Sequence, residues 1–382
     1  MPRPHHVVLV PGFFGFANLG DFAYFGHVRD FLAEMGPAVG LRGDVVVVPT
    51  IPTASLRVRA AKVAEAVARA ADGDDGEVSI VGHSSGGLDA RLFVTPDVSL
   101  PSPLDVERYA RRVRSIVTVS APHLGTPVAH LFNSLLGQQL LRLLSVLTMY
   151  AVRAGRLPIG AGLRIAHLFR RRRAGAHPGS VVEQLVDELL ADFSSHRRHE
   201  IERFLSTLGK DQDLLGQITP GGMDVFNAST EDRPGVRYGC VVTRARPPGL
   251  RSFASSLKDP YAIATHALYV ALYRIASGTP PAREPRLTRE QAAALRRAYG
   301  WRTDMRANDG MVPTLSQIWG DVICAAWADH LDVIGHFHRP THVPPHFDWL
   351  SSGSGFDRPQ FEQVWREVAA FLAAGAAAEA HG

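Results

Sequence analysis

Short apolar runs alternate along this chain with longer stretches that have the amphipathic character of helices. Each run is rich in Val and Ile and almost continuously hydrophobic, which is typical of parallel strands buried on both faces. The predicted strands cover His6–Val10, Asp44–Val48, Val78–Val81, Ser115–Val119, Val236–Val242 and Asp321–Ala326. Helices are predicted over Leu56–Ala71, Gly87–Val94 and Phe361–Ala374. The pattern predicts an α/β protein with about six mostly parallel core strands.

The alternation stops between Val128 and Asn227. This segment contains the leucine-rich stretch Ala129–Ala154 and two amphipathic stretches, Val181–Phe193 and His199–Leu208. We therefore expect a core formed by residues 1–127 and 228–382, with 128–227 inserted as a helical lid or cap. The alternative is that the leucine-rich helices are part of an enlarged core. Residues 252–299 are a second non-strand stretch and a candidate second cap segment.

A G-x-S-x-G sequence, Gly82-His83-Ser84-Ser85-Gly86, lies between a predicted strand and a predicted helix. In this setting a sharp turn exposes the serine hydroxyl, and the helix directs N–H groups at developing negative charge. Ser84 is therefore a candidate nucleophile. The alternative is a small-residue turn without catalytic function.

A serine nucleophile needs two N–H donors for the oxyanion, and one usually comes from the residue after the serine, here Ser85. The other comes from a loop after an earlier strand. The segment Pro11-Gly12-Phe13-Phe14-Gly15-Phe16 follows the first predicted strand, and its glycines allow close backbone approach to a substrate. Phe13 is the candidate second donor. The alternative is an ordinary glycine-rich loop.

Six segments in the same order along the chain resemble the bacterial true lipases of the Pseudomonas/Burkholderia type, which belong to the α/β-hydrolase superfamily. They are Leu9–Phe16 with Asp21–Gly26, Gly82–Gly87, Ser120–Thr126, Ile218–Asn227, Asn308–Val312 and His330–Asp332. The resemblance implies an α/β-hydrolase fold that lacks the first antiparallel strands and carries a large helical lid.

The resemblance also implies a catalytic triad of Ser84, Asp309 and His330, since the acid of these lipases lies in an N-D-G motif and the histidine precedes Leu-Asp. The order Ser…Asp…His is also that of hydrolase folds in general. Phe14 and His83 are implied substrate-binding residues. Without the motifs other residues would compete for these roles: Asp304, Asp321, Asp329, His336, His338, His342 and His346.

The chain departs from these lipases at three places. Pro11 stands where the family usually has histidine, and Leu315 stands where it often has a disulfide cysteine. The family also has a structural calcium, for which Asp332 is the candidate ligand. His336 replaces a glutamine there and is a poor calcium ligand, and no second carboxylate is evident. We therefore expect that no cofactor is required, with a structural calcium at Asp332 as the alternative.

The composition is that of a globular protein: 382 residues, 46% hydrophobic, 20% charged, with a net charge of +4. This mild charge does not favour nucleic acid as a partner. Cys240 and Cys324 lie in predicted strands and are expected to be free thiols. The start of the chain does not resemble a signal peptide, and no apolar run is long enough for a transmembrane helix. These features favour a cytoplasmic location, with a secreted mature form as the alternative.

Together these features predict a serine hydrolase of apolar carboxylic esters, most simply a lipase or esterase. The alternatives are a thioesterase or polyester depolymerase with the same triad, or a catalytically silent protein that binds lipid. Arg170–Arg173 is either a solvated tip of the insertion or a basic contact for an anionic lipid surface. The expected partners are an apolar ester substrate and a transient lipid interface at the cap.

Overall fold

The computed structural model describes most of the predicted core and little of the predicted lid. The described residues are 3–13, 24–74, 76–132, 186–187, 190–191, 194–195, 198–199, 201–202, 213–249, 252, 260–339, 341–342, 346 and 348–377. Most of the predicted lid helices, Phe14 and Arg170–Arg173 therefore lie outside the described residues.

A six-stranded, all-parallel sheet forms the centre of the molecule, with strand order β2-β1-β3-β4-β5-β6. Its strands are β1 His5–Val10, β2 Val45–Val47, β3 Glu77–His83, β4 Val113–Val119, β5 Arg237–Arg244 and β6 Asp321–Trp327. All six are at predicted positions. The inner strands β1, β3 and β4 are buried nearly throughout, as continuous Val/Ile runs predict.

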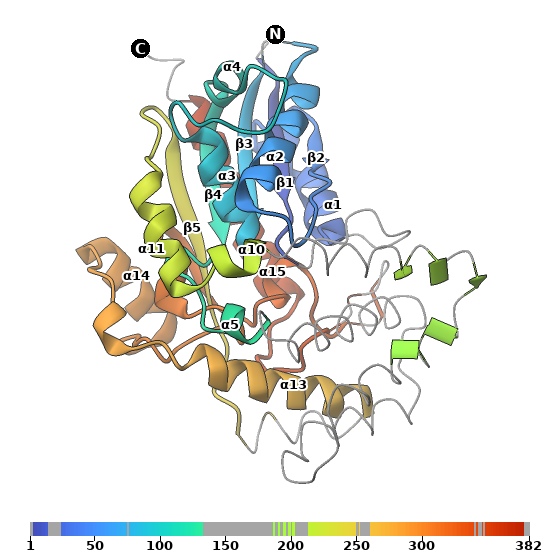
Figure 1. Cartoon of the computed structure of the whole chain (residues 1–382), viewed down its shortest axis with the longest axis vertical. Coiled ribbons are helices and arrows are strands. Elements are labelled where there is room, and N and C mark those ends of the chain that lie inside the picture. Colours follow the sequence, from blue (N-terminus) through green and yellow to red (C-terminus); the bar gives the residue numbers. More distant parts are fainter. Residues whose placement is uncertain are drawn as a thin grey trace.

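Helices cover both faces of this sheet (Figure 1). The larger ones are α1 Gly26–Met35, α2 Leu56–Ala71, α3 Ser85–Val94, α11 Pro220–Ser229, α13 Pro260–Ala276, α14 Arg289–Tyr299 and α15 Arg358–Ala377. The shorter ones are α4 Val106–Ala110, α5 Val128–Phe132 and α10 Asp213–Gln217. Single 3₁₀ turns lie at Gly36–Val39, Pro281–Arg283, Thr314–Gln317 and Asp332–Ile334.

The direction of the strand order decides which face each helix covers. From β1 the chain moves outward to β2 and then back past β1 to β3, and right-handed crossovers place α1 on one face and α2 and α3 on the other. Accordingly α1 packs with α15, and α2 packs with α3. Trp365 of α15 is fully buried and donates its indole N–H to the Val333 carbonyl at 2.8 Å. The late helix α15 thus supports the loop that follows His330.

The last part of the predicted lid, residues 213–227, packs on the core. Leu214 donates its backbone N–H to Thr53 at 3.2 Å, and Thr126 donates to Ile218 at 3.0 Å. Leu214 and Met223 are fully buried. The reason is apolar content: α10 packs its hydrophobic side chains against α2 and α5, and α11 packs against α10.

The predicted second cap segment divides into two helices with different surroundings. Helix α14 packs on the edge strand β6, where Leu295 and Tyr299 join a separate apolar cluster. Helix α13 crosses the end of the molecule opposite α4 (Figure 1), and its Tyr273 carbonyl accepts a hydrogen bond from Asn308 at 3.2 Å. Ser277, the residue after α13, also accepts a hydrogen bond from the Asn308 side chain at 2.9 Å, so this end of α13 contacts the predicted acid loop.

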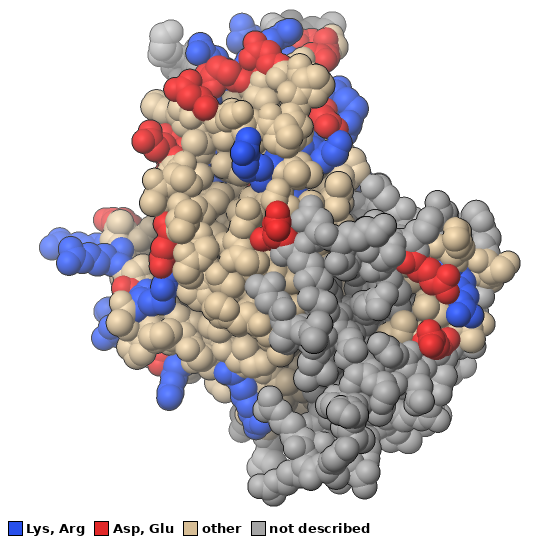
Figure 2. Space-filling model, in the orientation of Figure 1, with Lys and Arg blue, Asp and Glu red and all other residues tan. Residues whose placement is uncertain are grey.

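Both cysteines are free in the structure and pack into different apolar clusters. Cys240 lies with Leu295 and Tyr299, whereas Cys324 packs against the main core. Burial raises the pKa of the Cys240 thiol to about 12. Within the described part of the chain, no helix combines the length and apolarity needed to cross a bilayer. On the face shown in Figure 2, acidic and basic side chains of the described residues are interspersed.

Candidate active site

Ser84 lies at the sharp turn between β3 and α3, as predicted. Its φ of 55° and ψ of −132° are a conformation that non-glycine residues rarely adopt, at a cost on the order of 1–3 kcal/mol. The turn is held because Ser84 donates its backbone N–H to Val119 of β4 at 2.8 Å. A side chain on Gly86 would lie 2.1 Å from the Val10 carbonyl oxygen, so only glycine allows this close packing.

The loop after β1 lies directly against Ser84. A Cβ atom on Gly12 would be 2.6 Å from the Ser84 Cβ and 3.2 Å from its Oγ. Phe13 follows Gly12 and is buried against Phe132 of α5, with the ring centroids 6.1 Å apart. Ser85 is the first residue of α3, where backbone N–H groups have no partner within the helix. The structure thus brings both predicted oxyanion donors, Phe13 and Ser85, next to Ser84.

A buried arginine holds this loop, and the sequence analysis missed it. Arg59 of α2 is fully buried and paired with Asp89 of α3, with 2.7 Å between Nη2 and Oδ2. The same Nη2 donates to the Pro11 carbonyl at 2.8 Å. Burial raises the pKa of Asp89 to about 6, although Arg59 opposes this effect. The signal available in the sequence was Arg59 itself, a single arginine on the apolar face of the helix predicted over Leu56–Ala71.

Asp309 and His330, the predicted acid and base, are brought together. The Asp309 Oδ2 and His330 Nδ1 atoms are 2.8 Å apart, and both side chains are almost completely buried. The backbone joins them too, since His330 N–H donates to the Asp309 carbonyl at 2.9 Å. With Nδ1 engaged, the remaining ring nitrogen, Nε2, is the atom that can exchange a proton with a substrate or nucleophile.

The Asp309 carboxylate accepts hydrogen bonds on both oxygens. Oδ1 accepts from the backbone N–H groups of Met311 and Val312 at 2.9 and 2.7 Å. Oδ2 accepts from Thr243 Oγ1 at 2.9 Å and Gln317 Nε2 at 3.1 Å, in addition to His330. These donors stabilise the ionised form of a buried carboxyl group. Thr243 and Gln317 were not predicted, because they belong to no motif and come into contact with Asp309 only when the chain folds.

His83 connects the nucleophile turn to the histidine loop. Its Nε2–H donates to the His330 carbonyl at 2.8 Å, while its Nδ1 accepts from the Tyr24 hydroxyl at 2.6 Å. The Tyr24 oxygen in turn accepts from the Gly12 N–H at 3.4 Å. His83 is fully buried, and burial together with the nearby His330 lowers its pKa, so it stays neutral.

Both ring nitrogens of His83 are bonded to protein groups, which suits a positioning residue; that His83 contacts substrate stays a prediction. The ring of His83, the residue before Ser84, lies with its centroid 4.7 Å from that of the His330 ring. Within the described residues, no hydrogen bond joins the Ser84 hydroxyl to the His330 ring. In active sites without substrate, hydrogen bonds between catalytic groups are often long or poorly aligned, and they tighten when substrate binds.

The rival acids and bases are placed elsewhere. Asp304 caps a turn through the backbone N–H groups of Arg306 and Ala307, and Asp321 begins the edge strand β6. His336 donates to the Tyr24 carbonyl at 3.1 Å and stacks on Trp349 with ring centroids 4.2 Å apart. None of these three groups contacts Asp309 or His330 through a hydrogen bond in the described part of the chain.

Asp332 lies in a cluster with Asp329 and Asp348, beside His330. Their oxygens lie within 4.8 Å of one another. Asp329 accepts from the backbone N–H groups of Leu331 and Asp332 at 3.0 Å, so it orders the chain around His330. Burial raises the pKa of Asp329 to about 6, and burial with the nearby Asp329 charge raises that of Asp348 to about 8.

These three carboxylates fit a calcium ion. Calcium prefers several oxygen ligands including carboxylates, and crowded buried carboxylates need either protons or a cation. The structure thus supplies the second carboxylate that the sequence did not reveal. Asp329 was recognised only as a rival acid, and Asp348 gave no signal because it lies farther along the same loop, outside the histidine motif.

Comparison with known proteins found no match to any protein-family model or to any curated protein. Solved structures do match. The lipase of Staphylococcus hyicus aligns with a TM-score of 0.56 at 14% identity, covering 99% of this chain and 98% of that one. A carboxyl esterase of metagenomic origin aligns with a TM-score of 0.52 at 18% identity, covering 97% and 76%. Lipase 1 of Pelosinus fermentans aligns with a TM-score of 0.52 at 15% identity, covering 96% and 99%.

This similarity extends over nearly the whole chain and, at such low identity, concerns the fold. Together with the six-stranded parallel sheet flanked by helices, it shows that the chain has an α/β-hydrolase fold.

Proposed function

We propose that this protein is a serine hydrolase of carboxylic esters, with Ser84 as nucleophile, His330 as base and Asp309 as acid. The hydrogen bond between Asp309 and His330, within a fold that turns Ser84 toward the same end of the sheet, is the observation that carries the proposal. The structural neighbours support it, since they are lipases and esterases. The narrower resemblance to Pseudomonas/Burkholderia lipases is part of the proposal.

In the proposed mechanism, His330 Nε2 removes the Ser84 proton while Oγ attacks the ester carbonyl. The backbone N–H groups of Phe13 and Ser85 stabilise the oxyanion, an interaction typically worth about 3–4 kcal/mol per donor. His330 then protonates the leaving alcohol, and a water molecule releases the acid from Ser84 in a second cycle. Asp309 holds the imidazole tautomer and stabilises its cationic form.

The proposed substrate is an apolar acyl ester. Each buried CH₂ group of an acyl chain adds about 0.8 kcal/mol to binding, so the leucine-rich lid that we propose would favour long acyl chains. A thioester or a polyester would react through the same steps. We also propose that the predicted insertion, residues 128–227, acts as a lid at a lipid interface and that Phe14 contacts the substrate.

Asp329, Asp332 and Asp348 are the residues that would hold the proposed calcium ion. The ion would neutralise their mutual repulsion and thereby stabilise the loop that carries His330. The steps of ester cleavage involve only side chains and backbone groups of this chain.

Labelling with a fluorophosphonate, which reacts with activated serines, tests the proposal. We expect one label per wild-type chain, no label on Ser84→Ala, and normal labelling of the exposed control Ser99→Ala. A series of p-nitrophenyl esters of increasing chain length, with an emulsified triglyceride, then identifies the preferred acyl group. Labelling that persists in Ser84→Ala would show that the nucleophile lies elsewhere.

A further inference from the structure

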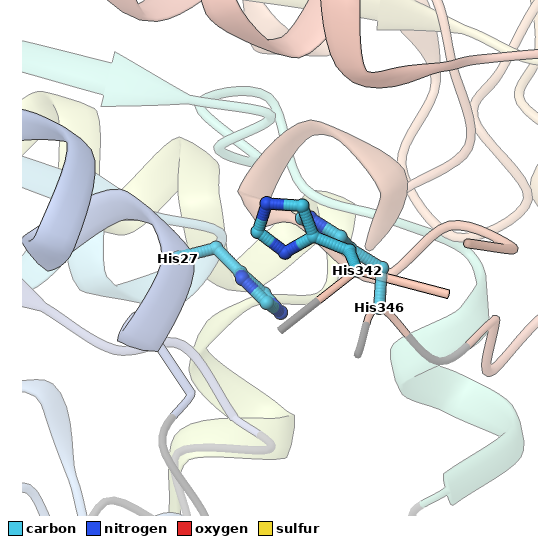
Figure 3. A group of neighbouring side chains, drawn as sticks. All are labelled: His27, His342 and His346. Atoms are coloured by element: carbon cyan, nitrogen blue, oxygen red, sulfur yellow. The ribbon is translucent and has the colours of Figure 1, made fainter. Parts of the chain in front are cut away.

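A cluster of three histidines lies apart from the acid and base, between α1 and the loop that follows His330. His27 comes from α1, whereas His342 and His346 come from the loop, and the three rings point toward one another (Figure 3). Their ligand nitrogens lie within 4.8 Å of one another. The His27 and His346 rings stack with centroids 3.6 Å apart, and those of His342 and His346 are 4.8 Å apart.

The backbone brings this cluster together at two points. Gly335 has a φ of 105°, and a Cβ atom there would lie 2.8 Å from the His27 Cβ, so this turn packs directly on α1. Arg339 and His346 form an antiparallel bridge, with N–H···O distances of 3.2 and 3.1 Å. The bridge closes the loop on itself and places His342 and His346 against α1.

His346 has the arrangement expected of a metal ligand. Its Nδ1–H donates to the Gly335 carbonyl at 2.7 Å, which fixes the tautomer and leaves the lone pair on Nε2. The residue is only 1% exposed, and Nε2 has no hydrogen-bond partner in the described part of the chain. Metal-binding histidines typically donate their second nitrogen to a carbonyl or carboxylate in this way. A buried polar atom without a partner costs about 1–3 kcal/mol unless a ligand satisfies it.

A positively charged side chain, that of Arg358, already contacts this cluster. The Arg358 guanidinium donates to His342 Nε2 at 2.8 Å and to Glu362 at 2.7 Å. A metal ion bound through the lone pair of His342 Nε2 would displace the Arg358 guanidinium from that nitrogen. The guanidinium would keep its hydrogen bond to Glu362. Arg358 is therefore expected to compete with the metal for His342.

We propose that His27, His342 and His346 form a site for a divalent transition-metal ion, with Zn²⁺ as the best fit. Three imidazoles leave one of the four positions of tetrahedral zinc open, and imidazole favours zinc over calcium or magnesium. Zinc–nitrogen distances are about 2.0–2.1 Å, so two nitrogens bound to one tetrahedral ion lie roughly 3.4 Å apart. The stacked rings of His27 and His346 must therefore rotate so that one nitrogen of each faces the ion. The ion would tie α1 to the histidine loop. This inference stands independently of the proposed hydrolase activity.

The test is a Zn²⁺ titration of the full chain, prepared without an affinity tag and freed of metal by chelation. The titration competes against a chromogenic chelator, with excess Ca²⁺ present to occupy the carboxylate cluster. We expect one zinc ion per chain, and affinity weakened by about 100-fold or more in His27→Gln and in His346→Gln. The control is His338→Gln, an exposed histidine outside the cluster, which should bind as the wild type does.

Two further measurements guard against misfolding and against nonspecific binding. The melting temperature in chelator shows whether each variant folds, and His27→Gln decides the matter if His346→Gln does not fold. Bound Co²⁺ should give the visible absorption of a tetrahedral site in the wild type and in His338→Gln but not in the cluster variants. Arg358→Gln should bind zinc more tightly. The proposal is overturned if the wild type binds no zinc, if the cluster variants bind as tightly, or if Arg358→Gln binds no better.

Discussion

Two acidic sites flank His330, and they stabilise buried carboxylates in opposite ways. Asp309 is a single carboxylate that accepts hydrogen bonds from two backbone N–H groups and three side chains. Asp329, Asp332 and Asp348 instead lie together, and burial raises the pKa of each. The cluster also accepts hydrogen bonds, from Ser352, Ser354 and backbone N–H groups, but three carboxylates this close repel one another, and a cation or protons would relieve that repulsion.

The difference separates two kinds of function. A carboxylate held by protein donors keeps its geometry whatever ions are present, which suits an acid that orients a base. In a crowded cluster, a bound cation removes the repulsion between the carboxylates and so stabilises the folded loop that carries them. The comparison therefore predicts that chemistry depends on Asp309 and that stability responds to calcium.

The largest effect is expected for Asp309→Asn. The change keeps the shape of the side chain but removes the charge that stabilises the His330 cation, and we expect kcat for a soluble ester to fall about 10⁴-fold. Added calcium should not restore it. The measurement is kcat with and without calcium, with Asp304→Asn as the matched control at a turn. A small loss, or rescue by calcium, would contradict the distinction between the two sites.

The next largest effect is expected on the stability of the folded protein, when calcium binds. An ion that binds only the folded protein at 100 times its Kd stabilises it by about 2.7 kcal/mol, so the melting temperature should rise with Ca²⁺ and fall in a chelator. Asp348→Asn should abolish this response, since it removes one ligand of the cluster. An identical response in Asp348→Asn and the wild type would rule out the cluster as the binding site.

A pH-dependent effect of intermediate size is expected at His5, a buried imidazole 3.9 Å from the Glu77 carboxylate, whereas His330 lies 2.8 Å from that of Asp309. Burial lowers the pKa of His5 to about 4 from 6.5. Its neutral form stabilises the fold above about pH 6.5, and this contribution is lost as pH falls toward 4, by about 2 kcal/mol near pH 5. Urea unfolding at pH 7 and 5 should show a larger loss in the wild type than in His5→Gln. Equal losses would show that other groups control acid stability.

The smallest effect is expected for Thr243→Val, which removes one donor to Asp309 without changing the size of the side chain. Losing one hydrogen bond to a charged group costs about 1.5–3 kcal/mol, so kcat should fall roughly tenfold or more. Thr243→Ser retains the hydroxyl and should keep most of the activity. If valine and serine behave alike at this position, the hydroxyl does not contribute to the acid site.

The sequence predicted the sheet well because its signals are local. Val and Ile runs locate all six strands, and α2 begins and ends where the pattern predicts. The turn at Ser84 and the pairing of Asp309 with His330 followed from short motifs. Tyr24, Thr243, Gln317 and Asp348 were missed because their roles depend on contacts between distant segments, which no periodicity reveals. Most of the predicted lid lies outside the described residues and stays a prediction.

The indole of Trp365 beneath the Val333 carbonyl has a consequence for the order in which the site matures during synthesis. The ribosome makes the turn at Ser84 early, while helix α15 emerges only after all six strands of the sheet. Until α15 has docked, the loop carrying His330 lacks one of its supports, so a nascent chain would hold a nucleophile without a fixed base. Under the proposed mechanism, a chain made in this order stays inactive toward esters until its late helix has left the ribosome.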